Sequence, residues 1–393
     1  MDSSMLDRSL VEREYGFLKD VIFLNASSVV MPPMRVQNAY GNFMAEYVRA
    51  FGAGVVPKGW DIVNEARGRL ASLINCQAHE IAFTKNTCEG LSIAAAAIDV
   101  SKGDNAVVCD QEHEANLFPW MNQRRRGLEL RVVHARDGEV DIAALLARCD
   151  DRTKALSVSS AQFTTGHAVD LRKLGAECRA RDIIFVVDGV QSVGRLKLDV
   201  KECNIDYLAA GGHKGLLGTL GAGFVYCSDR IVSELIPPYA SYQSVINHVP
   251  PPALTTQFDY LEWQPDARRL EAGSPNFNGV LAISRGVELI LELGIENIES
   301  TIRALESEFR SLIANLPLKI VEPSVPERRS GIVCVYYPKG TETEVQAILR
   351  SRKIFCSMQA GYLRFCIEFY NTSEQIEIAA GALQEISRLR SAA

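Results

Sequence analysis

The strongest constraint on the fold is a repeated alternation of short apolar runs and amphipathic stretches. The apolar runs cover 80–84, 105–110, 154–160 and 183–188, and the stretches that follow them are CEGLSIAAAAI, EANLFPWMNQRRR, LRKLGAECRARD and VKECNID. Strands that are apolar along their whole length and alternate with helices indicate a parallel sheet that is buried on both faces. We therefore predict an α/β fold in which helices flank a mainly parallel sheet.

The pattern changes after the segment PPYASYQSVINHVPPPAL. A long helical stretch over 280–314 is broken at Gly294, and strands at 331–338 and 362–369 enclose the helix TETEVQAILRSR. The closing helix has Asn371 as its predicted N-cap, with Glu374 three residues later. A chain of 393 residues is long enough for two domains. We predict a large α/β domain at 20–260 and a small α+β domain, with a connecting helix, formed by 1–19 and 261–393.

Charge and cysteine usage restrict the partners and the compartment. The formal charge of −6 argues against nucleic acid or an anionic membrane as the main partner, and no apolar stretch is long enough to span a bilayer. The ten cysteines are scattered singly, without the spacing of a zinc site, so no metal is predicted. Because the first twenty residues also lack a signal-like apolar segment, we expect reduced thiols in a cytoplasmic protein.

Polar residues follow the apolar runs at the points where the predicted strands end. In parallel α/β sheets, ligands bind beyond the carboxyl ends of the strands. Strand ends become loops and loops are polar, which explains one or two such residues but poorly explains a lysine, an aspartate and two histidines at one edge. We predict that one rim of the sheet gathers Thr87, Cys88, Glu89, His113, Asn116, Gln162, Thr165, Asp188, Gln191, His213 and Lys214.

Three of these residues together indicate a cofactor. Asp188 ends an apolar strand, where a carboxylate needs a cation or donors, although it could also cap the next turn. Thr87 is predicted to cap a helix whose N-terminus can bind a phosphate, although a cap without a ligand is the commoner use. Lys214 lies among six glycines, which would let the backbone approach a flat ligand closely. An amine for a Schiff base, a carboxylate for a pyridinium and a helix end for a phosphate are what pyridoxal 5'-phosphate (PLP) requires.

The glycine run GLLGTLGAG also suggests a dinucleotide site. That interpretation is rejected because the run precedes a predicted strand, whereas the dinucleotide turn follows a strand and opens a helix.

The chain resembles the class V aminotransferase and cysteine desulfurase family of fold-type I PLP enzymes. The resemblance runs from FLNASS to YNTSEQIEI, and its most specific parts are VVDGVQSVG, GGHKGLLGTLGAG and RLEAGSPNFNG, in that order. It implies the fold-type I large domain with a small C-terminal α+β domain. It also implies that Lys214 forms the internal aldimine and moves the α-proton, and that Asp188 pairs with the pyridine nitrogen.

The resemblance assigns further roles. Gln191 would bond the ring's 3′ oxygen, and His113 would stack on the ring face. Arg364 would grip the substrate carboxylate, and Asn25 would line the substrate side. The cofactor-binding set would be Thr87, Cys88, His113, Gln162, Asp188, Gln191, His213, Lys214 and Ser274. Because Ser274 would reach the phosphate of the other subunit, the resemblance implies a homodimer with shared active sites.

The sequence departs from the family in two places. Gly211 stands where the family often has a serine for the phosphate. Desulfurases carry a nucleophilic cysteine on a loop before the carboxylate-binding arginine, but here that interval is the short KIFCSMQAGYLRF. We expect Cys356 to lie on a strand as a small buried residue, and Cys366 to lie within the next strand, because a cysteine that takes up sulfur needs exposure and a lowered pKa.

We therefore predict a PLP-dependent transferase or lyase that acts on an α-amino acid by transamination or by β-elimination, as a C–S lyase does. The alternatives are a cysteine desulfurase that uses Cys356, an amino-acid epimerase, and a non-catalytic PLP-fold protein that binds a partner. Schiff-base chemistry at Lys214 without a cofactor is a further alternative, but it leaves Asp188 and the phosphate site unexplained. The side chain of the substrate is not indicated by the sequence.

Overall fold

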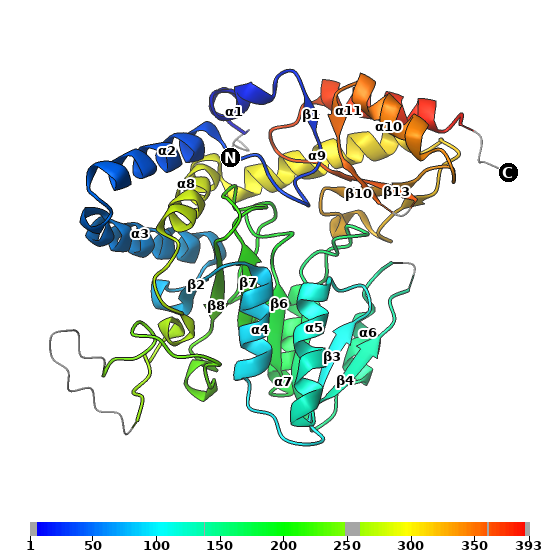
Figure 1. Cartoon of the computed structure of the whole chain (residues 1–393). Coiled ribbons are helices and arrows are strands. Elements are labelled where there is room, and N and C mark those ends of the chain that lie inside the picture. The colour runs from blue at the N-terminus through cyan, green and yellow to red at the C-terminus, as the bar shows by residue number, and fades with distance from the viewer. Residues whose placement is uncertain (1–5, 137, 248–259, 360, 390–393) are drawn as a thin grey trace, which may run out of the picture.

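The computed structural model describes residues 6–136, 138–247, 260–359 and 361–389. Its centre is a seven-stranded sheet (Figure 1) whose spatial order is β2 (Ile81–Thr84), β8 (Gly223–Cys227), β7 (Tyr207–Gly211), β6 (Ile184–Asp188), β5 (Thr153–Ser159), β3 (Asn105–Cys109) and β4 (Glu129–Val133). The strands from β7 to β4 are parallel, and only β8 runs antiparallel to its neighbours β2 and β7. The predicted α/β class with a mainly parallel sheet is confirmed.

Helices cover both faces of this sheet. Successive residues of a strand point to opposite sides, so one strand contributes to a buried cluster on each face. In β6, Phe185 and Val187 belong to one buried cluster and Val186 belongs to the other. The cluster with Val186 includes residues of α4 and α5, which lie together over one face in Figure 1. The helices of this part are α2 (Met34–Arg49), α3 (Val56–Ile74), α4 (Thr87–Ala97), α5 (Glu114–Asn122), α6 (Ile142–Ala147) and α7 (Leu171–Ala180).

One helix predicted for this part is wrong. The stretch VKECNID forms turns between β6 and β7 instead of a helix. The Asp199 carboxylate accepts hydrogen bonds from the backbone N–H groups of Lys201 and Glu202, and Asn204 has a positive φ of 48°. These local bonds compete with helical ones, and a left-handed residue ends a helix.

A second, antiparallel sheet has the order β12 (Ser357–Gln359), β13 (Tyr362–Cys366), β10 (Ile332–Tyr336) and β9 (Ile320–Val321). Its own buried cluster includes residues of α9 (Ile295–Ile313), α10 (Glu342–Ser351) and α11 (Ser373–Ile386). The break at Gly294 is where predicted, since α8 (Phe277–Leu293) ends there and α9 begins. The N-cap of α11 is Thr372 rather than the predicted Asn371, whose side chain instead accepts from Glu368 N and donates to Phe23 O.

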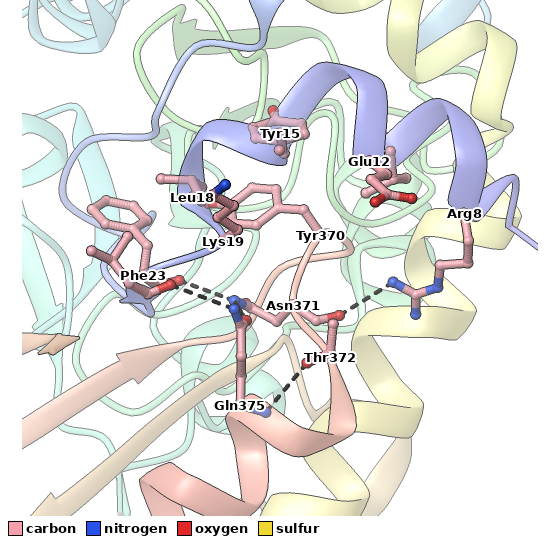
Figure 2. A pocket seen from close by; sticks show the side chains of 13 residues that line it. Arg8, Glu12, Tyr15, Leu18, Lys19, Phe23, Tyr370, Asn371, Thr372 and Gln375 are labelled. Carbon is pink, nitrogen blue, oxygen red and sulfur yellow. Dashed lines mark hydrogen bonds between the residues drawn. The ribbon is translucent and has the colours of Figure 1, made fainter. Parts of the chain in front are cut away.

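The N-terminal segment packs beside this second sheet. The short strand β1 (Ile22–Phe23) pairs in parallel with β11 (Ile354–Phe355). From α1 (Arg8–Tyr15), the Arg8 guanidinium donates to the backbone oxygens of Phe369 and Asn371. These contacts border a cavity of about 310 Å³ between α1 and the start of α11, shown in Figure 2. The N-terminal helix α1 is thus joined to the segment that precedes α11.

Short 3₁₀ turns complete the described structure, at Gly16–Leu18, Ala53–Val55, Ala78–Glu80, Gln123–Arg126, Val232–Glu234, Ala267–Leu270 and Pro326–Arg328. Within the described ranges, no helix combines the length and the apolar character needed to cross a membrane.

Candidate active site

A cavity of about 330 Å³ lies where the carboxyl ends of the central strands meet the small sheet. It brings together most of the residues predicted for one rim, with residues from the N-terminal segment and from the small sheet. Its lining comprises Ser27, Ser28, Asn86, Thr87, Cys88, His113, Ala115, Phe163, Asp188, Val190, Gln191, His213, Lys214, Gln359 and Arg364.

Asp188 is the last residue of β6 and is almost fully buried, with 2% of its surface exposed. One carboxylate oxygen accepts from the backbone N–H of Val190 at 2.9 Å. The pKa of Asp188 is raised to about 7, mainly by burial and also by the nearby Glu112 carboxylate, against the lowering effects of Val190 N–H and Lys214. A carboxylate in this state is suited to a cationic partner that a ligand brings.

Lys214 lies in the turn that follows β7. Burial lowers the pKa of its amine, and so does Arg364, while Asp188 raises it. A lowered pKa makes a larger share of the amine neutral and therefore able to act as a nucleophile or a base.

Two of the glycines around Lys214 are required by packing within the protein. A Cβ atom at Gly212 would lie 2.6 Å from Ile283 of α8, and one at Gly215 would lie 2.2 Å from the carbonyl oxygen of Val193. Neither distance leaves room for a side chain. These glycines allow protein segments to pack tightly against the turn and so hold the Lys214 backbone in place.

The N-terminus of α4 forms one end of the cavity. The prediction that Thr87 caps this helix is wrong, because Asn86 is the N-cap and its side chain accepts from Glu89 N at 2.9 Å. Thr87 Oγ1 is therefore left buried and has no partner within the described part of the chain, and the same holds for His213 Nδ1. At Gly211, where the family often has serine, a Cβ would lie 3.0 Å from His213 Nδ1 and 3.2 Å from Thr87 Oγ1. The two polar groups thus face a common space beside the positive end of the helix.

His113 forms another wall of the cavity. It is the N-cap of α5, and its Nδ1 accepts from Ala115 N at 3.1 Å, which fixes the ring. Its ring centre lies 5.0 Å from that of Phe163 in an edge-to-face arrangement. Burial lowers the pKa of His113, with further lowering from Lys214 and Arg364 and an opposing effect of Glu114. The imidazole is therefore mostly neutral at neutral pH.

Arg364 reaches the cavity from β13 and is 4% exposed. One terminal nitrogen donates to Phe163 O at 3.0 Å, and the other donates to Ser28 Oγ at 2.8 Å. A guanidinium has two hydrogens on each terminal nitrogen, so one on each remains for another acceptor. Ser28 was missed in the sequence, although it lies in FLNASS close to the predicted Asn25.

Six predicted residues do not line this cavity. Gln162 is buried, and its amide donates to Glu112 Oε1 at 3.0 Å. Asn25 forms a β-bridge with Cys366. Ser274 lies in a separate cavity of about 300 Å³, where its hydroxyl is 3.0 Å from Tyr242 Oη. Glu89 lies in the same separate cavity as Ser274, the Asn116 amide donates to Glu112 Oε2, and the Thr165 hydroxyl donates to Gly138 O.

Glu112 is a buried residue that the sequence did not single out. Its carboxylate accepts from Asn116 Nδ2, from Ser159 N and Oγ, and from Gln162 Nε2. Ser159 is the cross-strand neighbour of Asp188, so this network lies directly beside the end of β6. Burial raises the pKa of Glu112, and its hydrogen bonds lower it. Glu112 directly precedes His113 in QEHEAN, but no local pattern in the sequence indicates which groups it contacts.

Cys88 lies at the cavity as predicted, whereas Cys356, predicted to be buried on a strand, lies just outside a strand and is partly exposed. Cys356 lies between β11 and β12, packs against the core of the small sheet, and has a pKa raised to about 12 by burial. Cys366 is buried within β13. Neither lines the cavity, whereas Cys88 of α4 does.

The polar groups of the cavity fit PLP. Thr87 Oγ1, His213 Nδ1 and Gln191 Oε1 are buried without a hydrogen-bond partner among the described residues, a state that is rare unless a ligand or water completes it. The helix N-terminus suits a phosphate, Asp188 suits a pyridinium N–H, and Lys214 suits an aldehyde. Across the ranges that the structure covers, no cluster of three or more His, Cys, Asp or Glu side chains could hold a metal ion.

Comparisons with known proteins identify the family and similar folds. Residues 22–378 match the family described as aminotransferase class-V. A probable cysteine desulfurase of Methanothermobacter thermautotrophicus is 29% identical over 96% of this chain and 97% of its own length. The apo structure of a cysteine desulfurase from Thermococcus onnurineus NA1 superposes with a TM-score of 0.88 at 24% identity, covering 99% of this chain and 100% of that one. The cystine C–S lyase C-DES, in complex with its product cysteine persulfide, gives a TM-score of 0.85 at 20% identity, covering 95% and 100%. The two structural likenesses concern the fold.

Proposed function

The chain belongs to the aminotransferase class-V family of PLP-dependent enzymes, and we propose that it acts on a free α-amino acid by transamination or by β-elimination. The observation that carries the proposal is the joint placement of Lys214, Asp188 and Arg364 around one cavity. An amine with a lowered pKa and a free edge of a guanidinium then face the same space. This arrangement suits a substrate that has a reacting carbon next to a carboxylate.

The residues that would hold PLP divide by chemistry. The N–H groups at the start of α4, with Thr87 Oγ1 and His213, would hold the phosphate. Asp188 would accept from the pyridinium nitrogen, Gln191 would bond the ring oxygen, and the neutral His113 ring would cover one face. The chemistry that PLP supplies when bound is withdrawal of electrons from the α-carbon of an amino acid.

The chain's own residues would bind the substrate and move its proton. The remaining hydrogens of Arg364 would bind the carboxylate through two parallel hydrogen bonds. Because Ser28 Oγ accepts from Arg364, its own hydrogen is free to donate to the same carboxylate. Lys214 Nζ would take the proton from the α-carbon as a general base. It would then donate that proton to whichever atom the reaction requires.

After the α-proton has been removed, two reactions are possible, transamination and β-elimination. Transamination requires that the proton be delivered to the cofactor side, and β-elimination requires a leaving group on the β-carbon. Support for elimination of a sulfur group comes from the names of the similar proteins, a probable cysteine desulfurase and a cystine C–S lyase. Desulfuration through Cys356 has less support, because a thiol with a pKa of about 12 is rarely ionised at neutral pH.

We also propose a homodimer with shared sites. Ser274 lies outside the Lys214 cavity of its own chain, which is what a residue that serves the partner's phosphate would require. Sedimentation velocity of the purified protein tests this, and a monomer that binds PLP and turns over substrate would contradict it. The domain division at about residue 260 remains a proposal, and part of that boundary, 248–259, lies outside the described residues. The cytoplasmic location is likewise proposed, supported by ten cysteines that are all free.

The visible absorption of the purified protein tests the function while amino acids, cysteine included, are added one at a time. Decay of the cofactor band to a stable pyridoxamine spectrum would identify transamination. A band that shifts and recovers while a 2-oxo acid and ammonia accumulate would identify elimination, and a sulfide assay would show whether sulfur leaves. No visible band after added PLP would overturn the proposal.

A further inference from the structure

We propose that Cys88 is a redox-sensitive site that controls the loading of PLP, an inference that rests on the cofactor site proposed above. All ten cysteines lie in the described part of the chain, and Cys88 is the only one that is exposed. It is the second residue of the eleven-residue helix α4 and lines the same cavity as Asp188 and Lys214. A reagent in solution can therefore reach this thiol before the others.

The immediate surroundings of Cys88 are built for an anion. The preceding residue, Thr87, is 6% exposed and its Oγ1 has no partner among the residues described. His213 Nδ1 faces the same space from the turn after β7. The first N–H groups of a helix add donors and a positive potential. Cys88 therefore adjoins the groups that would hold the cofactor phosphate.

The reduced thiol does not compete with that phosphate. Burial raises the pKa of Cys88, Asp188 raises it further, and Lys214 only partly opposes them. The thiol is therefore neutral at neutral pH, and a neutral SH group beside a phosphate adds no repulsion. At neutral pH this position becomes mainly anionic only when the sulfur is oxidised.

Hydrogen peroxide supplies that oxidation. The small ionised fraction of the thiol attacks one peroxide oxygen, the O–O bond breaks, and the departing hydroxide takes up the thiol's proton as water, which gives a sulfenic acid. A second peroxide molecule gives the sulfinic acid and another water, and the sulfinic acid ionises at neutral pH. The resulting anion is stabilised by the N-terminus of α4, which is where the phosphate would bind. Charge repulsion and lost space then oppose loading of the cofactor.

The test uses the full-length protein freed of cofactor. The protein is treated with hydrogen peroxide, the excess is removed with catalase, and PLP uptake is followed by visible absorption and by the cofactor retained after desalting. Peptide mass spectrometry identifies the oxidised residue. Cys88→Thr and the control Cys356→Ala are treated in parallel, and each protein is compared with its own untreated sample.

We expect oxidised wild-type protein and oxidised Cys356→Ala to bind PLP about tenfold more weakly than their untreated samples. Cys88→Thr should change by less than about twofold, and prior loading with PLP should protect Cys88 from peroxide. Full PLP uptake by protein whose Cys88 is shown to be a sulfinic acid would overturn the inference, as would an equal loss in Cys88→Thr. Failure of untreated protein to take up PLP would instead overturn the proposed function, and the inference with it.

Discussion

Arg195 and Glu368 form an ion pair that is enclosed almost completely, with side-chain exposures of 1% and 0% and an Nε–Oε1 distance of 2.5 Å. Arg195 also donates to the carbonyl oxygens of Gln191 and Ile367. The pair thereby joins the segment that carries Gln191 to the segment that follows β13. Arg195 therefore holds together two parts of the chain that supply lining residues of the cavity, Gln191 and Arg364.

Removing one member of this pair should destabilise the protein strongly. Glu368→Leu leaves the Arg195 charge buried without a counter-ion, and we expect a loss of about 3–5 kcal/mol in the free energy of unfolding. Denaturant unfolding measures this. The double variant Arg195→Met/Glu368→Leu should lose less than Glu368→Leu alone, because no charge is then buried. Glu385→Gln, which removes the partly exposed partner of Arg352, is the control and should change stability by less than about 1 kcal/mol.

The pKa of Asp188 predicts how the stability of the cofactor-free protein depends on pH. Its folded pKa of about 7 is above the ordinary value of 3.8, so its favourable contribution is present below pH 3.8 and is lost as pH rises to 7. The loss amounts to roughly 4 kcal/mol. His213 acts in the opposite direction, since its pKa is lowered from 6.5 to about 4 by burial and then by Lys214. The pH dependence of wild-type stability therefore combines the two effects, and the contribution of Asp188 is obtained as the difference in stability between a variant and wild type.

Asp188→Asn should become progressively more stable relative to wild type as pH rises from about 4 to about 7. Denaturant unfolding of both cofactor-free proteins across this range measures the difference. Added PLP should reduce the difference, because a pyridinium N–H would stabilise the ionised carboxylate of the wild type. A constant difference between the two proteins at every pH would show that Asp188 is ionised normally.

Ser28 should contribute to binding through the carboxylate of the substrate and not through its amine. We expect Ser28→Ala to weaken binding of L-alanine about tenfold, the effect of one hydrogen bond to a charged group. Binding of ethylamine, which lacks only the carboxylate, should stay within about twofold of wild type. Spectral titration of the PLP-loaded protein measures both ligands. An equal loss for both would mean that Ser28 acts on the fold of the cavity and not on the carboxylate.

Cys356 should be dispensable for turnover. Its thiol is packed against the core of the small sheet and has a pKa of about 12. We expect Cys356→Ala to release sulfide or 2-oxo acid from L-cysteine at a rate within about twofold of wild type. A loss of sulfide release in Cys356→Ala, with PLP still bound, would favour the desulfurase alternative. Lys214→Ala serves as the inactive comparison.

Several features followed from the sequence because they depend on local pattern. The apolar runs predicted the positions of β2, β3, β5 and β6, since a strand buried on both faces must be apolar throughout. The motifs around Asp188 and Lys214 placed both residues at strand ends, where the structure has them. Such features can be predicted from the spacing of apolar residues along the chain and from the residue types at the ends of its helices and strands.

Other features were decided only by the tertiary structure. Asn86 rather than Thr87 caps α4, and Glu112 rather than a cofactor engages the amide of Gln162. Ser28 meets Arg364 across more than three hundred positions of sequence. Each outcome depends on which of several chemically able side chains lies within hydrogen-bond distance after the sheets have packed. That selection is made by the packing of distant segments, and no pattern within either segment encodes it.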